Sequence, residues 1–452
     1  MNALLRRSQG DWPFPAGRSP VYYGWVIAAV STLGFIMSIP GQTMGMAVFA
    51  DAFMEAFGLS RTELSTAYLL GTTGSALFLT HAGRLFDRWG ARALTVLSAL
   101  LLGSALLAIS TFDHLIAALT AATGLPPLPV AFLLMLLGFF AIRFSGQGVL
   151  TSASRNVLLL WFQRRRGLIS GVRGVFVSFA FASAPAALAL LTGAVGWRGA
   201  LWVLAALVGG AFAILAAVTL RDRPEACGLA VDGGPAAPAS PETEAPSSAT
   251  GASSNGEPSA LGAVRRSPLF WVYASALALH AFFGTAVTFH VAALFEEAGR
   301  TRVEAFAYFL PQAGISVVVN LLASAWADRS ALKPFLLLML GAFFLGALGV
   351  LGLGTPLGYG ALLFGFGVGG GLWSVLSNLA FVRLFGTAAL GEISGLNTAL
   401  SVFASALGPL AFALAQDTFG TLSSAAYGCA ALSAGLWLWA LRLPQPDDRP
   451  ER

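Results

Sequence analysis

The sequence predicts an all-α, polytopic membrane protein. Hydrophobic residues make up 56% of the 452 residues and charged residues only 10%, whereas about a quarter of the residues are charged in ordinary soluble domains. This composition excludes a water-soluble globule. Apolar runs of roughly 20 residues, long enough to cross a bilayer as helices, recur along the whole chain. The twelve predicted spans are residues 22–50, 63–82, 92–111, 130–155, 167–193, 198–219, 269–295, 304–326, 334–353, 357–382, 390–416 and 421–441.

One polar stretch separates the first six spans from the last six. It is rich in Pro, Ala, Ser and Gly and offers little apolar area to bury, which is typical of a disordered linker. The chain is therefore expected to form two six-helix halves. The predicted parts are an N-terminal tail (1–21), an N-terminal half (22–220), the linker (221–267), a C-terminal half (268–441) and a C-terminal tail (442–452).

The basic residues predict how these spans are oriented, because Lys and Arg in the connections stay on the cytoplasmic side. Of the 26 basic residues, four lie in predicted outer connections and two inside spans, which leaves 20 on the side of the linker and both termini. We therefore expect the linker and both termini to be cytoplasmic, in a multi-pass protein of a bacterial inner membrane. The outer four are Arg61, Arg198, Arg300 and Arg302, and the two inside spans are Arg143 and Arg173.

The two halves also resemble each other in sequence. Residues 58–63 (GLSRTE) match residues 299–304 (GRTRVE), and at the same offset the pair Asp87-Arg88 falls on Asp328-Arg329. A second set of matches, at another offset, relates spans 5 and 11. Weak internal similarity of this kind is typical of transporters built from repeats, whose substrate sites lie between the halves near the bilayer midplane.

The sequence lacks the motifs that several other classes of protein require. The chain contains no Gly-x-x-x-x-Gly-Lys-[Ser/Thr] loop and no His-Glu-x-x-His motif. Its four histidines are scattered, and Cys227 and Cys429 form neither a CxxC site nor a disulfide framework. We therefore expect no enzyme, no bound metal and no cofactor, and the net charge of +5 reflects topology rather than nucleic-acid binding. A non-transporting membrane sensor remains an alternative.

A motif rich in glycine and arginine connects spans 2 and 3. Residues 83–92 read GRLFDRWGAR, and a degenerate copy, SAWADR, occupies residues 324–329. The motif resembles the cytoplasmic signature of the major facilitator superfamily, Gly-x-x-x-Asp-Arg-x-Gly-x-Arg. Together with the twelve spans, their equal division and the central linker, this resemblance covers nearly the whole chain. It implies the major facilitator fold and secondary active transport by alternating access.

The resemblance also implies a latch at the cytoplasmic face. Gly83 permits close helix approach, and Asp87 can sit at a helix N-terminus and pair with a neighbouring arginine. Such contacts would hold this face shut in one conformation. The alternative is ordinary cytoplasmic positive charge beside a glycine turn. The predicted gate residues are Gly83, Asp87, Arg88, Arg92, Asp328 and Arg329.

An arginine in span 4 is the main candidate for substrate contact. Counted from Pro129, Arg143 lies about 20 Å into the helix, and Gln147 shares its face. Residues 140–148 also resemble the superfamily's second motif. A guanidinium at mid-membrane is unfavourable unless it is paired or faces a water-filled cavity, and the spans carry no midplane carboxylate. We therefore expect a small organic anion bound bidentately; the alternative is an arginine bonded to helix carbonyls for structure or proton coupling.

Polar groups in other spans are further candidates for lining the same site. A Pro-Gly pair breaks span 1, so Gln42 and Thr43 either contact substrate or mark a packing kink. In span 10, Trp373 and Asn378 either line the cavity or follow glycines that serve helix packing. Arg173, near the cytoplasmic end of span 5, either snorkels to the inner surface or lies on the substrate path.

Two histidines in span 7 are the candidates for proton coupling. His280 and His290 are separated by ten residues, about 15 Å along a helix axis, which is too far for one metal site. Either imidazole can exchange protons near neutral pH, or each is structural. His290 is also a candidate for substrate contact.

Shorter matches resemble the branch of the superfamily that includes monocarboxylate transporters and oxalate/formate antiporters. They include residues 23–25 (YGW), residues 161–167 (WFQRRRG) and His290. That branch usually carries a substrate-binding arginine in span 8, where this chain offers only Gln312 and Asn320. The sequence thus predicts a monomeric transporter in the lipid bilayer for a small organic anion, coupled to protons or to a counter-solute. The alternative within the same fold is efflux of drug-like compounds.

Overall fold

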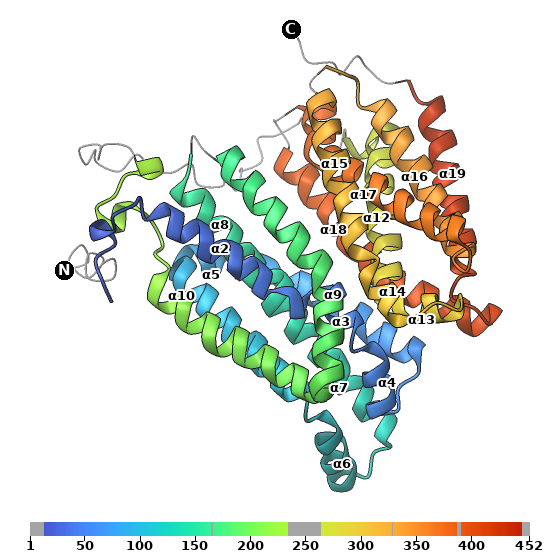
Figure 1. Ribbon diagram of the computed structural model, residues 1–452, viewed down its shortest axis with the longest axis horizontal. Coiled ribbons are helices and arrows are strands. Elements are labelled where there is room, and N and C mark those ends of the chain that lie inside the picture. Colours follow the sequence, from blue (N-terminus) through green and yellow to red (C-terminus); the bar gives the residue numbers. More distant parts are fainter. Residues whose placement is uncertain (1–12, 164–165, 234–263, 328, 387–389, 445–452) are drawn as a thin grey trace, which may run out of the picture.

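The computed structural model describes residues 13–163, 166–233, 264–327, 329–386 and 390–444, and every regular element in these ranges is a helix. The helices form two bundles, blue to green and yellow to red in Figure 1, which confirms the predicted fold class. The first bundle contains α2 (Gly24–Met37), η2 (Ile39–Gly41), α3 (Thr43–Ala47), α4 (Ala50–Phe57), α5 (Arg61–Ile109), α6 (Phe112–Thr123), α7 (Pro127–Ile142), η3 (Arg143–Leu150), α8 (Thr151–Trp161), α9 (Arg166–Ala205), η4 (Ala206–Phe212) and α10 (Ala213–Thr219). The second contains α12 (Pro268–Phe289), α13 (Val291–Glu297), α14 (Arg302–Ala307), α15 (Phe309–Ala327), α16 (Lys333–Leu351), α17 (Pro356–Phe385), α18 (Leu390–Phe419) and α19 (Ala425–Arg442).

Nine helical segments in the described ranges are long and apolar enough to cross a membrane. One of them, Gly171–Thr219, covers most of the predicted span 5 and all of span 6. The predicted spans 63–82 and 421–441 are not among the nine, although the first is helical in α5 and most of the second in α19. The described helices are therefore consistent with twelve spans, and that count stays a prediction.

Two glycines divide the longest helices. Gly90 in α5 has a φ of +85°, and Gly196 in α9 has a φ of +72°. A side chain with a Cβ is strained in this left-handed region, which glycine adopts freely. Each glycine therefore marks the turn between two consecutive predicted spans.

The predicted internal repeat recurs in the local backbone geometry. Gly58 and Gly299 both have a positive φ, +65° and +75°. In each copy the following N-cap residue, Ser60 or Thr301, forms a capping box with the glutamate three positions later. This exchange of two hydrogen bonds satisfies backbone amides at the helix start, so α5 and α14 begin in the same way.

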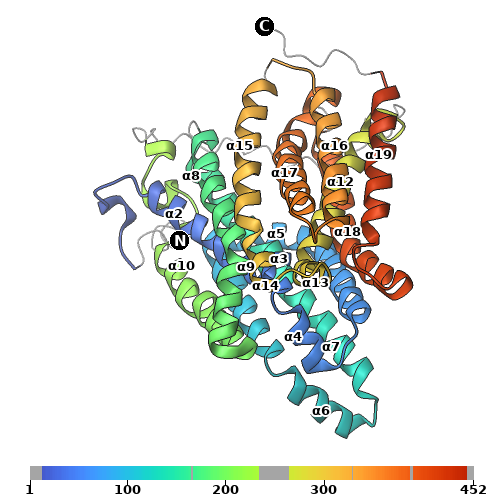
Figure 2. The same cartoon turned by 45° about the vertical axis from the view of Figure 1, so that its right-hand side comes forward.

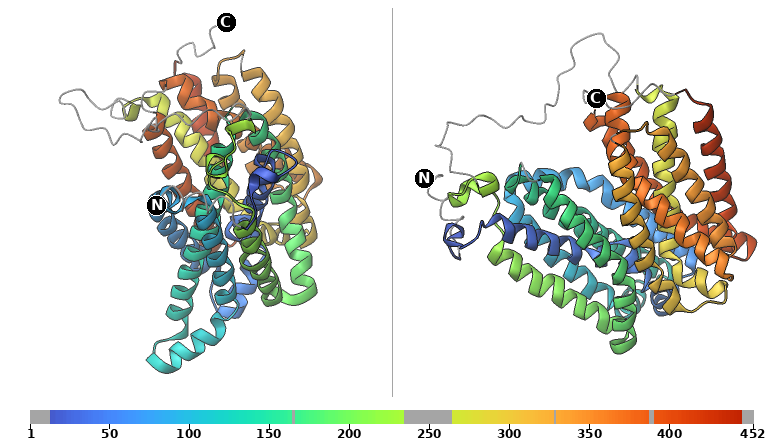
Figure 3. Two further views of the ribbon diagram at one scale, coloured as in Figure 1. Left: turned by 90° about the vertical axis from the view of Figure 1, so that its left-hand side faces the viewer. Right: turned by 45° about the horizontal axis from the view of Figure 1, so that its top comes forward.

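The two bundles meet at one end and diverge towards the other, as Figures 1 and 2 show. At the shared end, α5 packs against α18, α9 packs against α15 and α14, and α3 packs against α12. The right-hand view in Figure 3 shows the same separation into an N-terminal and a C-terminal bundle. A site between the halves therefore lies where α3, α9, α12 and α15 approach one another.

Candidate functional site

Two adjoining pockets lie between the halves, with volumes of about 350 Å³ and 720 Å³. We call them together the central cavity. The N-terminal half contributes α3 and α9, and the C-terminal half contributes α12, α15 and α17. The residues that line both pockets are Met44, Phe181, His280, Phe309, Gln312 and Trp373.

The central cavity extends towards the predicted cytoplasmic face. Its larger pocket reaches Gly171 near the start of α9, Leu321 near the end of α15 and Asn378 near the end of α17. All three helix ends belong to that face in the predicted topology. The smaller pocket lies deeper and reaches Thr43 and Thr288.

The described lining of the cavity is aromatic and polar. Among the residues that the structure describes, no Asp, Glu, Lys or Arg lines either pocket. The imidazole of His280 stacks between two rings, with centroid distances of 5.2 Å to Phe343 and 4.8 Å to Trp373, and its Nδ1 is buried without a hydrogen-bond partner. Gln312 Nε2 donates to the carbonyl of Phe366 at 3.2 Å. The cavity can therefore bind flat, apolar groups and offers a few hydrogen bonds to orient them.

Arg143 lies directly behind this wall. The residue is 2% exposed, and its Nη1 donates to the carbonyl of Gly41 at 3.3 Å and to Thr43 Oγ1 at 3.4 Å. Its guanidinium carbon lies 5.2 Å from the centre of the Tyr68 ring, and its Nε has no hydrogen-bond partner among the residues that the structure describes. Thr43 lines the central cavity, and its hydroxyl is 2.7 Å from that of Tyr68. No carboxylate pairs with Arg143 within the described ranges.

Glycines bring the backbone of span 1 against span 4 beside this arginine. A Cβ built on Gly41 would lie 2.5 Å from the carbonyl oxygen of Ile142 and 2.7 Å from the Cα of Gly146. Span 4 adopts a π-helical turn in η3, beginning at Arg143, and such turns are rare and frequent at functional sites. The close approach places the Gly41 carbonyl within reach of the guanidinium.

Gln42, the residue after the break in span 1, also bonds across to span 4. Its Nε2 lies 3.2 Å from Ser38 Oγ and 3.4 Å from Thr151 Oγ1. Gln42 lines the smaller pocket as well. The break therefore both packs against span 4 and supplies polar groups to the cavity, so the two interpretations of span 1 are compatible.

Polar contacts between the halves close the end of the cavity opposite the predicted cytoplasmic face. Arg302 of the C-terminal half donates to Asp51 of the N-terminal half, and the Thr62 hydroxyl donates to Asp417 at 2.5 Å. On the predicted cytoplasmic face, by contrast, Lys333 donates to carbonyls of its own half. We call the contacts between the halves the outer seal. Its residues are Asp51, Arg61, Thr62, His290, Arg302 and Asp417.

His290 is the buried part of the outer seal, at 1% exposure. Its Nε2 lies 2.9 Å from the carbonyl oxygen of Pro409, and its Nδ1 lies 3.4 Å from Arg61 Nη1. Arg61 in turn donates to Asp51 at 3.2 Å. A change in the protonation of His290 would thus act on a contact between the two halves.

None of the gate residues whose side chains the structure describes lines the central cavity. The Arg92 amide donates to Asp222 Oδ1, at the start of the predicted linker, at 2.8 Å, and the Arg92 side chain donates to the carbonyl of Ala217 in α10. Gly83 lies within α5, and Arg88 and Arg329 are exposed. Asp328 and the side chain of Asp87 lie outside the described part of the chain, as does most of the linker.

The predicted substrate and proton residues fall into three groups. The first group lines the central cavity, the second lies in η3 behind it, and the third belongs to the outer seal. The first contains Gln42, Thr43, His280, Trp373 and Asn378, the second contains Arg143 and Gln147, and the third contains His290.

Sequence analysis did not single out the aromatic groups around Arg143 and the cavity. Tyr68 contacts Arg143, and Phe181 and Phe309 line both pockets. Tyr68 carried a usable signal, because it places a hydroxyl inside an otherwise apolar span. Phe181 and Phe309 carried none, since Phe is frequent throughout this chain, with 34 residues.

Breaking the outer seal should shift the protein towards a conformation that is open at the outer side. Arg302→Gln removes the ion pair with Asp51 across the halves, and partly exposed pairs of this kind contribute up to about 1 kcal/mol. We expect the outward-open population to rise about two- to fivefold. Distances between spin labels at Glu55→Cys and Thr421→Cys, one on each half, would report it.

The matched control is Arg198→Gln. Arg198 pairs with Asp113 at 2.5 Å with similar exposure, but both residues belong to the N-terminal half. Burial opposes ionisation of Asp113, yet the His114 amide and the charge of Arg198 hold the pKa of its carboxyl below the usual value, so this pair is charged as well. Equal distance distributions for both variants and the wild type would contradict the role of Arg302 in the seal.

Comparisons with known proteins agree with this architecture. A sequence model of the Major Facilitator Superfamily matches residues 18–409. A search of curated protein sequences finds no significant match. The structure is similar to that of a bacterial homolog of the human lysosomal transporter Spinster, in an inward-facing and unoccupied conformation, with a TM-score of 0.65 and 15% identity over 94% of this chain and 96% of that one. It is also similar to the nucleoside transporter NupG, with a TM-score of 0.63 and 15% identity over 94% and 100% of the two chains. At such identities the likeness shows a shared fold.

Proposed function

Because the chain belongs to the major facilitator superfamily, we propose that it is a secondary active transporter that carries a small, monocarboxylate-like organic anion through the central cavity. The observation that carries this proposal is the Arg143 guanidinium, which lies next to the cavity residue Thr43 without a carboxylate partner in the described ranges. A buried positive charge of this kind attracts an anion and repels a cation. The Arg143 Nε, which has no partner in the described part of the chain, is a further donor when the site rearranges.

The body of the solute would contact the aromatic part of the lining. Trp373, Phe309 and Phe366 offer apolar surface, and Gln42, Gln312 and Asn378 offer hydrogen bonds. The carboxylate would approach Thr43, from which Arg143 is one hydrogen bond away. Binding therefore requires a small movement of Thr43 that lets the substrate replace it as the partner of Arg143.

A second candidate is efflux of neutral or drug-like compounds. It is favoured by one specific observation: the described residues that line the cavity include no charged side chain. An apolar compound would be bound by the same aromatic groups without any movement of Thr43. The resemblance to the monocarboxylate and oxalate/formate branch supports the anion instead, although the usual arginine of span 8 is missing.

Transport would proceed by alternating access between the two halves. The described conformation is sealed at the outer side and open towards the predicted cytoplasmic face. In the opposite conformation the outer seal would break, and the predicted latch of Gly83, Asp87, Arg88, Arg92, Asp328 and Arg329 would close the other face. We place the protein, as a monomer, in a bacterial inner membrane on the distribution of basic residues and on the family.

Uptake into vesicles tests the proposal directly. Purified protein in liposomes is offered labelled lactate, pyruvate, formate and oxalate, and in parallel a set of neutral aromatic compounds. Accumulation of a monocarboxylate over protein-free vesicles is expected. Uptake of neutral compounds only would favour the second candidate, and movement of neither group in either direction would reject both.

Proton coupling is tested in the same vesicles with an imposed pH gradient. We expect the gradient to drive uptake in the wild type and to have at least about tenfold less effect in the variant that has lost the proton-carrying histidine. His290→Gln tests whether the transported proton is carried by a residue of the outer seal, and His280→Gln tests whether it is carried by a residue of the central cavity. A gradient effect that persists in both variants would exclude the two histidines as carriers.

A further inference from the structure

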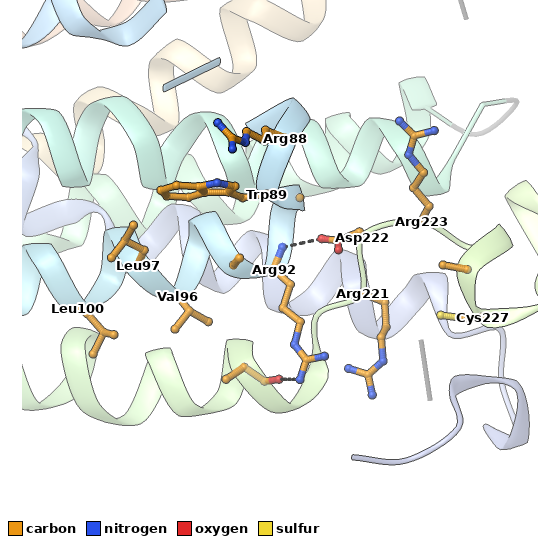
Figure 4. A pocket seen from close by; sticks show the side chains of 14 residues that line it. Arg88, Trp89, Arg92, Val96, Leu97, Leu100, Arg221, Asp222, Arg223 and Cys227 are labelled. Carbon is orange, nitrogen blue, oxygen red and sulfur yellow. Dashed lines mark hydrogen bonds between the residues drawn. The ribbon is translucent and has the colours of Figure 1, made fainter. Parts of the chain in front are cut away.

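A separate pocket of about 810 Å³ lies in the N-terminal half at the predicted cytoplasmic face. It is formed by α5 on both sides of its turn at Gly90, by the end of α10 and by the chain that follows α10 (Figure 4). Of its lining residues in the described part of the chain, four are arginines and one is an aspartate, which gives a formal charge of +3. We call it the basic groove. The charged residues are Arg88, Arg92, Arg221, Arg223 and Asp222.

Two of these arginines belong to the framework of the groove. Arg221 is 2% exposed and donates to the carbonyls of Val218, Leu220 and Phe14 at 2.8, 2.9 and 3.1 Å. Arg92 donates to the carbonyl of Ala217. These contacts hold both side chains in place at the inner wall of the groove, and Asp222 lies near enough to Arg92 to interact with its charge.

The single carboxylate is engaged with the backbone. Asp222 Oδ1 accepts from the Arg92 amide at 2.8 Å. A Cβ built on Gly90 would lie 2.6 Å from the Asp222 carboxylate oxygens, and the φ of +85° at Gly90 favours glycine in any case. Gly90 therefore lets Asp222 cap the helix that begins there, and the remaining arginines, Arg88 and Arg223, are exposed at the rim.

The rest of the groove is apolar and continues into the membrane-facing surface. Leu97 and Leu100 are 37% and 46% exposed and lie along α5 away from the arginines (Figure 4). Trp89, 46% exposed, lies next to Arg88 just before the predicted span 3, and aromatic side chains are enriched where spans meet the lipid headgroups. After the turn at Gly90, the helix rises about 14 Å from Ala91 to Leu100, which is nearly half of the hydrocarbon thickness of a bilayer.

We propose that the basic groove binds an anionic phospholipid of the inner leaflet. The headgroup lies at the arginine-lined end of the groove, and one acyl chain follows the apolar wall past Leu97 and Leu100. A groove with a basic end and an apolar wall matches an amphiphile with a negatively charged headgroup. A soluble phosphate would contact the basic end only and leave the apolar wall without a partner. Basic pockets between transmembrane helices at the cytoplasmic side suit such headgroups.

The proposal is tested by lipid binding to the purified protein in detergent, measured by native mass spectrometry. Phosphatidylglycerol and phosphatidylcholine are offered at equal concentrations. The wild type should prefer phosphatidylglycerol, and removal of each rim arginine should lower the preference about fivefold. The test variant is Arg88→Gln with Arg223→Gln, and the control is Arg265→Gln with Arg266→Gln, which removes the same charge from exposed residues of the same predicted face outside the groove.

Each outcome bears on the proposal. A loss of preference in the rim variant, with the control unchanged, supports it. Equal loss in both variants means that general surface charge attracts the lipid, and an unchanged rim variant means that the groove does not bind it. Glycerol phosphate at millimolar concentration should not displace the lipid; if it does, the site binds a small soluble phosphate and the lipid assignment is overturned. Equal melting temperatures of both variants exclude unfolding as the cause.

Discussion

Arg143→Ala should lower monocarboxylate uptake by at least about 100-fold. A bidentate guanidinium–carboxylate contact supplies two charge-assisted hydrogen bonds of about 1.5 kcal/mol or more each, and about 3 kcal/mol corresponds to a factor of more than 100. The substitution leaves Thr43 and Tyr68 bonded to each other at 2.7 Å, so the cavity wall keeps a hydrogen-bonded pair. The measurement is the initial rate of labelled uptake into vesicles over a range of substrate concentrations.

Arg143→Lys and Arg173→Ala are the matched variants. Lysine keeps the charge but not the planar fork, so we expect partial activity, with a raised KM. Arg173 is the other intramembrane arginine, and it lies over the Phe35 ring at 5.1 Å rather than next to Thr43. If Arg143→Ala takes up carboxylates as fast as the wild type does, the proposed anion site at Arg143 is wrong. If Arg173→Ala loses as much uptake as Arg143→Ala, the loss is caused by the total positive charge within the membrane and not by Arg143 in particular.

The neutral compounds separate a binding role from a structural one. If Arg143 only holds span 1 against span 4 through the Gly41 carbonyl, then Arg143→Ala should impair every transported solute to the same extent. If it binds the substrate carboxylate, neutral aromatic compounds that enter the cavity should be bound by the variant as well as by the wild type. The KM for carboxylates would then rise while the affinity for neutral ligands stays constant.

The sequence was sufficient for the overall architecture because membrane helices depend on simple rules. Each of the signals used depends on local physics. Apolar runs enter the lipid, basic connections stay on the cytoplasmic side of the membrane, and the repeated segment at Gly58 and Gly299 caps the start of a helix. The same holds for the break in span 1, which places Gln42 and Thr43 in the cavity. Local rules such as these can be applied to a single sequence without knowledge of its tertiary structure.

The pairings around the site could not be predicted in the same way. Arg61 and His290 are separated by 229 positions, and nothing in either segment indicates that they meet. The position of Arg143 was expected at mid-membrane, but whether it faced the cavity or the carbonyl of Gly41 depends on how two glycines pack. Such contacts follow from the tertiary arrangement of the halves and from their conformation, which no local pattern encodes.

Gly41→Ala should destabilise the protein by forcing spans 1 and 4 apart. The backbone at Gly41 does not have a positive φ, so alanine is not strained by its own conformation. The added methyl group would instead lie 2.5 Å from the Ile142 carbonyl oxygen and 2.7 Å from the Gly146 Cα. Because these atoms belong to the backbone of another span, they cannot rotate away, and the helices must separate. Overpacking of this kind lowers the free energy of unfolding by about 1–3 kcal/mol.

Gly193→Ala is the control that isolates packing from glycine's other properties. Gly193 lies in α9, also without a positive φ, and a Cβ there meets nothing within 4 Å. Thermal unfolding in detergent should therefore give a lower melting temperature for Gly41→Ala and an equal or higher one for Gly193→Ala, since alanine favours the helix. Equal melting temperatures would mean that spans 1 and 4 are not in backbone contact. If spans 1 and 4 separate, the Gly41 carbonyl also moves away from Arg143. The Gly41→Ala protein that remains folded should therefore show altered carboxylate uptake. Gly193→Ala should transport as the wild type does.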